Sequence, residues 1–323
     1  MNFTPIDNKG LVEGYCIIKA AERKVSSKGD AYLDLTLADK EGEINAKLWR
    51  YTEAVHGEYN INDLVKVRGT ISEYNGADQL RVERIRPVGS EDGVTIDDFV
   101  KTAGYSGEEM FEALFNLASS FEDKQLSSLV TSILSDHRLP LLYWPAAFKL
   151  HHAVRGGLLY HSLSIARLAE RLCNIYTFVD RELLIAGAIL HDIAKLSEFE
   201  VNETGLASGY TNEGNLLGHL TMGAMMVNEY AQKLNIDQKT AMLVEHMLIS
   251  HHGEPEFGAA VRPMFIEAEI LSELDLLDSR VYGMREAVLA TKEDEFTSRL
   301  WALDNRRLYN HARADINKET KLF

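Results

Sequence analysis

The chain has 323 residues, of which 46% are hydrophobic and 26% charged, an ordinary composition for a globular protein long enough to form two domains. Its formal net charge of −15 is unevenly placed, because residues 1–90 carry a net charge of −1 and the remainder carries −14. Such an acidic body excludes unaided binding of nucleic acid, so an approach to phosphates requires bound divalent cations or a near-neutral binding module.

The N-terminal segment lacks the basic and then apolar layout of a signal peptide. The longest apolar run in a helical context, residues 183–190, is much too short to span a bilayer. The two cysteines, Cys16 and Cys173, lie far apart and indicate neither a disulfide framework nor a metal-binding pair. We therefore expect a cytoplasmic protein with no membrane association.

Residues from about 11 to 88 are predicted to form short β-strands. β-Branched residues and apolar–polar alternation are typical of strands, and turn sequences such as Asn75-Gly76 separate them. The expected strands cover residues 14–20, 31–38, 44–49, 64–72 and 79–85. Five short strands in so small a segment predict a closed barrel, for which the OB-fold is the commonest candidate. We therefore place a nucleic-acid-binding OB-fold domain at residues 1–90.

Helical periodicity begins after a linker at residues 87–93. The expected helices cover residues 109–120, 124–136, 158–176, 180–196, 215–234, 237–252 and 263–289. A closing helix is expected over 294–312, a polar segment that carries Phe296, Trp301 and Tyr309. The predicted fold class is therefore multidomain, a small all-β barrel followed by an all-α domain at residues 91–323 with its core at about 150–290.

Side chains of the metal-ligand type recur along these helices. The dipeptide His191-Asp192 follows an apolar run that predicts a buried helix, where an unpaired charge is costly. A divalent cation would remove that cost, because neutral imidazole and carboxylate are both ligands of first-row metals. Facing helices of a bundle are where metal sites form. The neighbouring predicted helices supply His161, His219, His251, His252 and Asp275.

This ligand set suits one or two ions of Mn, Fe or another first-row metal such as Co, with Mg as a further alternative. Two ions would clamp both oxygens of an in-line phosphoryl displacement and supply a metal-activated hydroxide. Lys195 follows His191 by one helical turn and is expected on the same helical face. There it would bind a phosphate oxygen or help to position the attacking water. Asp192 and Lys195 are therefore the candidate catalytic residues.

The order His, His-Asp, His, His-His, Asp resembles the HD superfamily of metal-dependent phosphohydrolases. Three segments narrow the resemblance to the YhaM-type 3′–5′ exoribonucleases, namely Gly156-Gly157-Leu-Leu-Tyr-His161-Ser-Leu-Ser, residues 210–219 and residues 248–253. Those proteins also place an OB-type domain before an HD domain, so the resemblance covers nearly the whole chain. It implies a Mn-preferring exonuclease that acts mainly on single-stranded RNA, with single-stranded DNA as a second substrate, and releases mononucleotides.

The sequence after the paired histidines bears on the substrate. In HD phosphodiesterases that act on cyclic dinucleotides, the paired histidine is followed by a Gly-Tyr-Pro signature. Here the chain reads Gly253-Glu-Pro-Glu-Phe-Gly258, which argues against that substrate.

Several aromatic and basic side chains are candidates for contacts with the nucleic acid strand. In the first domain, the candidates for stacking on bases are Tyr32, Trp49, Tyr51 and Tyr74, and those for phosphate contacts are Lys47, Arg50, Arg68 and Arg81. The expected alternation places Trp49 in phase with the apolar residues of its strand, so a place in the barrel core is the competing interpretation. In the helical domain the substrate-binding candidates are Arg155, whose guanidinium geometry matches phosphate oxygens, and Tyr210.

Three further histidines are not assigned to the ligand set. His246 lies five residues before His251 and is expected on a different helical face, in a structural or supporting role. His151 and His152 precede the Gly156-Gly157 turn, and lining the substrate channel and a core or surface position are equal alternatives for them. One of His251 and His252 could orient other ligands instead of binding metal directly.

The leading hypothesis is thus a metal-dependent 3′–5′ exoribonuclease. One alternative is an HD-type phosphohydrolase of small nucleotides, although it gives no role to the barrel. Another is a non-catalytic RNA-binding scaffold, against which the intact ligand set argues. The acidic body and the aromatic C-terminal segment are also compatible with a homo-oligomer.

Overall fold

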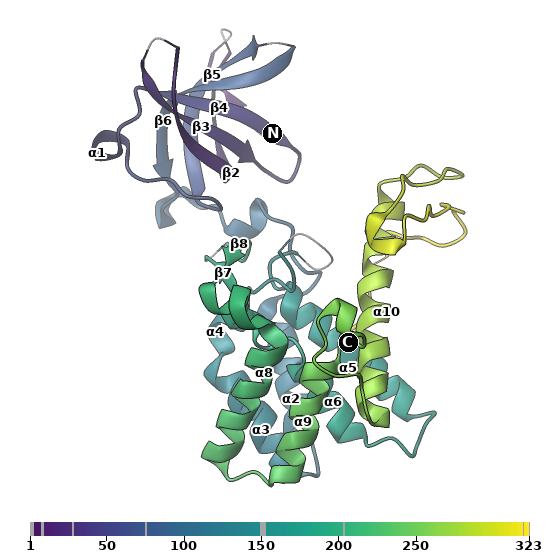
Figure 1. The fold of residues 1–323 in the computed structure, drawn as a ribbon. Helices are drawn as coiled ribbons and strands as arrows, with labels where there is room; N and C mark the ends of the chain where they lie inside the picture. Colours follow the sequence, from purple (N-terminus) through teal and green to yellow (C-terminus); the bar gives the residue numbers. More distant parts are fainter. Residues whose placement is uncertain are drawn as a thin grey trace. The chain divides into compact units, whose positions relative to one another are not determined.

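The computed structural model describes residues 3–7, 10–27, 29–74, 76–148, 153–202, 204–318 and 320–322. The chain divides into two compact units (Figure 1). The first comprises Met1–Lys101 with Asn202–Ser208, and the second comprises Thr102–Val201 with Gly209–Phe323.

The first unit is a closed β-barrel, as the alternation of apolar and polar residues predicted. Its strands are β1 (Thr4–Pro5), β2 (Leu11–Val25), β3 (Ala31–Ala38), β4 (Glu43–Trp49), β5 (Leu64–Tyr74) and β6 (Ala77–Pro87). They are ordered β1-β2-β3-β4-β6-β5, and an additional pairing of β2 with β5 closes the barrel. The short helix α1 (Glu53–His56) lies between β4 and β5, and the 3-10 helices η1 (Ser90–Asp92) and η2 (Ile96–Asp98) follow β6.

Strand β4 illustrates how this alternation fills the barrel. Ile44, Ala46 and Leu48 are buried in the barrel core, whereas Lys47 lies outside it and Trp49 keeps 38% of its surface exposed. The interpretation of Trp49 as a core residue is therefore wrong, because its phase is that of the polar residues of the strand.

A close approach between β5 and β6 requires glycine. The register of the two strands shifts between Arg68 and Gly69. A Cβ atom at Gly69 would lie 2.3 Å from the carbonyl oxygen of Arg81. A glycine at such a bulge lets the backbones approach and the barrel curve.

The second unit is helical. Its helices are α2 (Gly107–Ser119), α3 (Lys124–Asp136), α4 (Arg138–Leu141), α5 (Gly157–Cys173), α6 (Arg181–Leu190), α7 (Lys195–Glu198), α8 (Asn212–Leu234), α9 (Gln238–Ser250) and α10 (Ile266–Leu289). The 3-10 helices η3 (Pro255–Phe257) and η4 (Trp301–Leu303) are part of the same unit, and a two-stranded sheet pairs β7 (Phe199–Val201) with β8 (Ala207–Tyr210).

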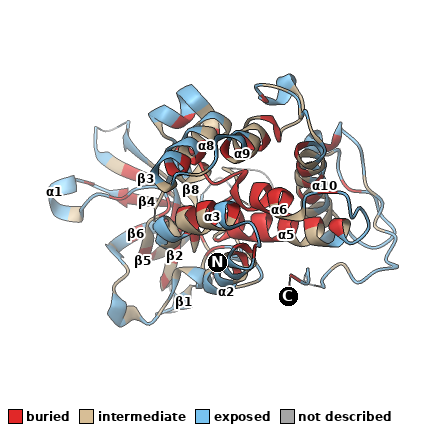
Figure 2. Ribbon diagram, turned by 90° about the horizontal axis from the view of Figure 1, so that it is seen from below, coloured by how far each residue is buried: buried red, intermediate tan, exposed pale blue. Residues whose placement is uncertain are grey.

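Helices α5 and α6 form the centre of this unit (Figure 2). Every residue of α6 from Leu183 to Leu190 is buried, in agreement with its continuous apolar sequence. Gly187 permits close packing at its middle, since a Cβ atom there would lie 2.2 Å from the Cε of Met247. Asp180 begins α6 by accepting the backbone N–H of Leu183, a typical N-cap bond. The two central helices therefore form a buried interior, and the ligand residues lie at one end of it.

The closing helix predicted over residues 294–312 is wrong. This segment instead folds back on itself, with isolated bridges between Phe296 and Tyr309 and between Leu300 and Arg306. The turn contains Asp304 and Asn305, both with a left-handed backbone at φ 55 and φ 57. Successive left-handed residues are incompatible with a right-handed helix, and Asp and Asn tolerate them better than most residues.

Within the part of the chain that the structure describes, no helix is both long enough and apolar enough to cross a membrane.

Candidate metal centre

Most of the predicted ligands lie at helix ends and not on helix faces. His191 directly follows the last residue of α6, and His251 directly follows the last residue of α9. His219 follows Gly218, whose φ of 70 and ψ of 158 interrupt α8. His161 in the first turns of α5 and Asp275 within α10 complete the arrangement. The ends of α6 and α9 and the break in α8 thus bring their ligands towards His161 and Asp275.

The free carbonyls of these helix ends orient the imidazole rings. His191 Nδ1 lies 3.0 Å from the oxygen of Ala188, and His251 Nδ1 lies 2.8 Å from the oxygen of Leu248. Carbonyl groups in the last turn of a helix lack intrahelical partners and accept such bonds. A carbonyl can only accept, so Nδ1 must carry the hydrogen and Nε2 keeps its lone pair. This is the tautomer that a metal ligand needs.

The first cluster contains His161, His191, Asp192 and Asp275. His161 Nε2 lies 3.0 Å from Asp275 Oδ1 and 3.2 Å from His191 Nε2. Asp192 Oδ2 lies 3.3 Å from His191 Nε2 and 3.7 Å from His161 Nε2. The ligand atoms of His161, His191 and Asp192 all lie within 4.8 Å of one another, which is a spacing that one ion could bridge.

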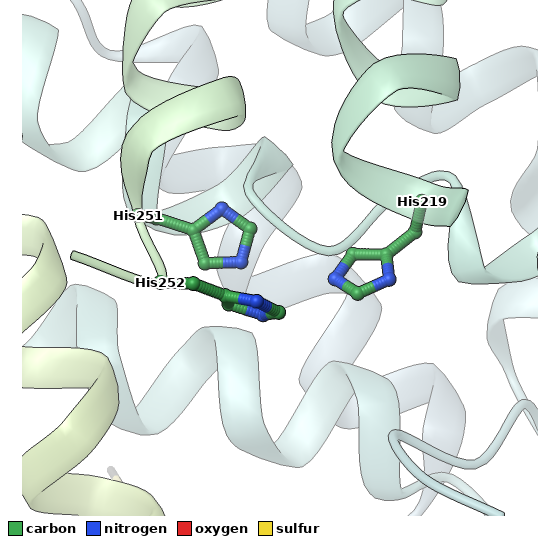
Figure 3. Close-up of side chains that lie close together, drawn as sticks. All are labelled: His219, His251 and His252. Carbon is green, nitrogen blue, oxygen red and sulfur yellow. The ribbon is translucent and has the colours of Figure 1, made fainter. Parts of the chain in front are cut away.

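The second cluster contains His219, His251 and His252, whose rings lie close together in tilted and edge-on arrangements (Figure 3). Their ligand atoms also lie within 4.8 Å of one another. His252 Nδ1 lies 2.8 Å from the backbone oxygen of Phe257, so this ring too is held with Nε2 free to bind.

Asp192 lies between the two clusters. Its Oδ2 faces the first, whereas its Oδ1 lies 3.3 Å from His219 Nε2 and 3.7 Å from His251 Nε2. These last three atoms are buried and have no hydrogen-bond partner among the described residues. Burying an unpaired carboxylate oxygen beside two unpaired imidazole nitrogens is costly. One divalent cation would satisfy all three atoms, so the residues present fit a metal centre.

The electrostatics of the centre keep most ligands in the metal-binding state. Burial alone would raise the pKa of Asp192, but Lys195 and His191 hold it well below its ordinary value. Burial likewise opposes ionisation of Asp275, yet its bond with His161 lowers the pKa of that carboxyl group. Burial and the nearby His191 depress the pKa of His251. Two carboxylates and a neutral imidazole are therefore available at neutral pH.

His161 differs from the other ligands. Burial lowers its pKa, but hydrogen bonds with Asp275 and Asp278 outweigh burial and raise the pKa to about 10. In the metal-free protein this ring is therefore protonated at neutral pH, and a metal ion must displace a proton from it.

Two carboxylates in contact with the ligands were not predicted. Asp278 Oδ2 lies 2.8 Å from His161 Nδ1, and Glu198 Oε1 lies 3.0 Å from His219 Nδ1. The spacing of Asp278, three residues after Asp275 on a helix, was a readable signal because residues at that spacing share a face. Glu198 carried no comparable signal, since its contact depends on the interruption of α8.

Lys195 and His191 both contact Oδ2 of Asp192. The expectation that Lys195 shares a helical face with His191 is wrong, because α6 ends at Leu190 and α7 begins only at Lys195. Lys195 Nζ instead lies 2.6 Å from Asp192 Oδ2. The backbone oxygen of Lys195 accepts the indole N–H of Trp144 at 2.8 Å, which fixes the start of α7.

Three histidines, His246, His151 and His152, were predicted to lie outside the ligand set. His246 Nε2 accepts the backbone N–H of Met264 at 3.0 Å, so it supports the chain after α9. His151 and His152 lie outside the described residues.

In the barrel, an exposed aromatic and basic surface lies across β3, β4 and β6. Tyr32 and Trp49 are register partners with ring centroids 4.7 Å apart. Lys47 lies over the Tyr32 ring at 4.9 Å and pairs in register with Arg81. We call Tyr32, Lys47, Trp49 and Arg81 the β3–β4 platform.

The barrel holds two other aromatic candidates, Tyr74 and Tyr51. Tyr74 is exposed at the end of β5. Tyr51 is buried, and its hydroxyl donates to the oxygen of Gly57 at 2.8 Å, so its interpretation as a base-stacking residue is wrong.

In the helical unit, Arg155 and Tyr210 both contact aromatic rings. The Arg155 guanidinium lies 5.2 Å from the centre of the Tyr143 ring. Tyr210 ends β8 and stays partly exposed while its ring packs edge-on against Phe148 and Phe199.

Two family models define the class of this protein. The model for an OB-fold nucleic acid binding domain matches residues 18–88, and the model for the HD domain matches residues 158–280. The second match contains every member of both ligand clusters, from His161 to Asp275. The chain is thus an HD-domain protein with an OB-fold domain in front.

Curated relatives define the family. The chain is 37% identical over 298 residues to the 3′–5′ exoribonuclease YhaM of Bacillus licheniformis, covering 92% of this chain and 94% of the relative. It is 36% identical to the protein of the same name from Bacillus subtilis, with the same coverage. It is 35% identical to that of Listeria monocytogenes, covering 93% of this chain and 95% of the relative. The chain therefore belongs to the YhaM family of 3′–5′ exoribonucleases.

Proposed function

We propose that this chain is a metal-dependent 3′–5′ exoribonuclease that shortens single-stranded RNA and releases mononucleotides. Family membership assigns the reaction class. The observation that supports the metal dependence is the set of three buried, unpartnered atoms, Asp192 Oδ1, His219 Nε2 and His251 Nε2, within the HD domain. A structural hydrogen-bond network would have paired these atoms.

Seven residues would hold the metal. The first ion would bind at the cluster of His161, His191, Asp192 and Asp275, and a second at His219, His251 and His252, with Asp192 between them. Imidazole and carboxylate donors favour Mn over Mg, with Fe and Co as the chemical alternatives. When bound, such ions supply Lewis-acid polarisation of the phosphoryl group and lower the pKa of water.

Lys195 is the cation that this chain itself brings to the reaction. Its side chain is 15% exposed although its Nζ bonds Asp192, so a phosphate could reach it. It would stabilise the negative charge that develops on the phosphoryl oxygens during attack. Asp192 would then both bind metal and hold Lys195 in place.

The β3–β4 platform is proposed to bind the RNA strand. Stacking on aromatic rings with cations along the backbone is how OB-folds bind single strands. Tyr74 would extend this surface along β5. In the helical unit, Arg155 would contact a phosphate, and the exposed part of Tyr210 would stack on a base near the 3′ end.

The buried, unpaired Cys16 and Cys173 are consistent with a cytoplasmic location.

A time course on 5′-labelled oligonucleotides tests the proposal. With Mn, the full chain should convert single-stranded RNA into a ladder that shortens from the 3′ end. His191→Ala should abolish the ladder. Parallel reactions with single-stranded DNA and with Mg establish sugar and metal preference. An intact RNA in the presence of demonstrably bound Mn would overturn the proposal, and hydrolysis of free nucleotides alone would point to a small-nucleotide phosphohydrolase.

A further inference from the structure

Glu198 is a buried carboxylate that touches a predicted ligand without belonging to the predicted ligand set. It is the last residue of α7 and is 7% exposed. Its Oε1 accepts the backbone N–H of His219 at 3.1 Å, and both of its oxygens lie 3.0 Å from His219 Nδ1. One side chain therefore holds both the backbone and the ring of the same histidine.

The interruption of α8 makes this contact possible. Gly218 departs from helical geometry at φ 70, a left-handed value that favours glycine. Where a helix is interrupted, the next backbone N–H groups need acceptors from outside the helix. Glu198 supplies such an acceptor to His219, as a side chain does at a helix N-terminus.

The position of Glu198 is itself fixed by the chain around it. Its backbone oxygen accepts the N–H of Thr211 at 3.0 Å. A Cβ atom at Gly214 would lie 2.3 Å from the same oxygen, so α7 and the start of α8 approach as closely as glycine allows. The carboxylate is thus presented to His219 by two segments packed backbone to backbone.

The consequence for His219 is a defined tautomer and a defined ring direction. A carboxylate accepts the Nδ1 hydrogen, and the Nε2 lone pair then points to the region where Asp192 Oδ1 lies 3.3 Å away. A carboxylate bonded to the far nitrogen of a histidine also makes that histidine a better metal donor.

We infer that Glu198 is a positioning residue for metal binding, which fixes His219 so that the His219, His251 and His252 cluster can hold its ion. The inference rests on the proposed metal centre. It concerns the second cluster alone, since the first has a carboxylate of its own in Asp278.

Glu198→Ala and Glu198→Gln separate the charge of this residue from its geometry. Alanine removes both bonds to His219. Glutamine removes the negative charge, but its amide oxygen can still accept the two bonds that Oε1 accepts now. Glu182→Gln is the matched control, because the Glu182 carboxylate also accepts backbone N–H groups, those of Glu122 and Asp123, at the opposite end of α6 from His191.

Two measurements on the full chain test the inference. Equilibrium dialysis with elemental analysis gives the number of Mn ions bound and their affinity. Glu198→Ala should lose affinity by about 10- to 100-fold at one ion, as other supporting carboxylates do. Glu198→Gln should lose less, and Glu182→Gln should match the parent. Equal Mn affinity in the parent and both Glu198 variants would overturn the inference.

Imidazole nitrogen spectra of the metal-free protein provide the second measurement. His219 should carry its hydrogen on Nδ1 in the parent and in Glu198→Gln, and should lose this preference in Glu198→Ala. An unchanged His219 signal in Glu198→Ala would overturn the inference. A parent protein that binds no Mn would instead refute the proposed metal centre, whereas the metal-free spectra would still report whether Glu198 positions the ring.

Discussion

Asp278 and His161 are joined by a buried contact of 2.8 Å between the carboxylate Oδ2 and Nδ1, on the side of the ring opposite the Nε2 that faces Asp275. The carboxylate of Asp278 also accepts the hydroxyl hydrogen of Ser164, one turn along α5 from His161. This pairing links α10 to α5 directly behind the first ligand cluster. It makes Asp278 the counterpart of Glu198 in the other cluster.

The first prediction concerns Asp278. Asp278→Asn should weaken Mn binding at the first cluster by about 10- to 100-fold, because the amide cannot support His161 as a carboxylate does. Competition titrations with a chelator measure this loss. In the double variant with Glu198→Gln the losses should fall on two different ions, and a combined variant no weaker than either single one would contradict the division into two clusters.

The second prediction compares the paired histidines. His251 belongs to a group with His219 and His252 and to another with His191 and Asp275, whereas His252 belongs only to the first of these groups. His251→Ala should therefore reduce the occupancy of both ions, and His252→Ala that of one. Elemental analysis after gel filtration reads out the difference. Equal loss in the two variants would refute it.

The third prediction is a pH dependence of metal binding. His161 has a pKa raised to about 10, so at pH 7 to 8 it carries a proton that the metal must displace. Because the pKa of His161 lies above this pH range, the affinity for Mn should increase with pH. The increase should be about tenfold per pH unit if one proton is released. His251, with its lowered pKa, adds no such competition. Calorimetry in buffers of different ionisation enthalpy counts the protons released, and a count of zero at pH 8 would contradict the prediction.

The fourth prediction separates catalysis from metal binding at Lys195. Lys195→Met should lower kcat on RNA by about 100- to 1,000-fold, the usual loss when one stabiliser of transition-state charge is removed. KM should change much less, and bound Mn should be retained because the metal ligands remain. A variant that loses its metal together with its activity would assign Lys195 to the support of Asp192 alone.

The fifth prediction concerns the β3–β4 platform. Trp49→Ala should weaken binding of single-stranded RNA by about 1–3 kcal/mol, the usual contribution of one base stacked on an aromatic ring. Hydrolysis of a dinucleotide should be unaffected. Tyr51→Phe is the control, because Tyr51 is buried and only its hydroxyl bond to Gly57 is lost. Fluorescence anisotropy with labelled RNA measures both variants, and equal binding by Trp49→Ala and the parent would refute the platform.

Sequence periodicity predicted the barrel and most helices because both depend on local burial patterns. Strand β3 was predicted with its observed bounds, Ala31–Ala38, since its buried residues Leu33, Leu35 and Leu37 alternate with less buried ones. Periodicity failed at residues 294–312. The spacing of the aromatic residues predicted a helix, but Asp304 and Asn305 form a turn with a left-handed backbone. Local backbone chemistry outweighed side-chain spacing there.

The sequence indicated which residues are candidate ligands. It did not show that most of them lie at helix ends, or which carboxylates support them. His191 was expected on a helix with Lys195, but the helix stops between them. Glu198 could not be predicted as a partner of His219, since their contact joins residues 21 positions apart through a break at Gly218. Such contacts arise from tertiary geometry, which no single-sequence period contains.

Several ligands lie where a helix ends or is interrupted. Glycines at these places, which bind no metal themselves, therefore influence the geometry of the centre. Gly253 follows His252 with φ +77, and a Cβ atom there would lie 2.9 Å from Ser272 Oγ. Gly218, directly before His219, has φ +70, which is also a left-handed value that L side chains rarely adopt. Alanine at position 218 or 253 would therefore strain the backbone beside His219 or His252 without changing any ligand. In this chain, the glycines that end or interrupt the helices help to set the geometry of the centre together with the ligands themselves.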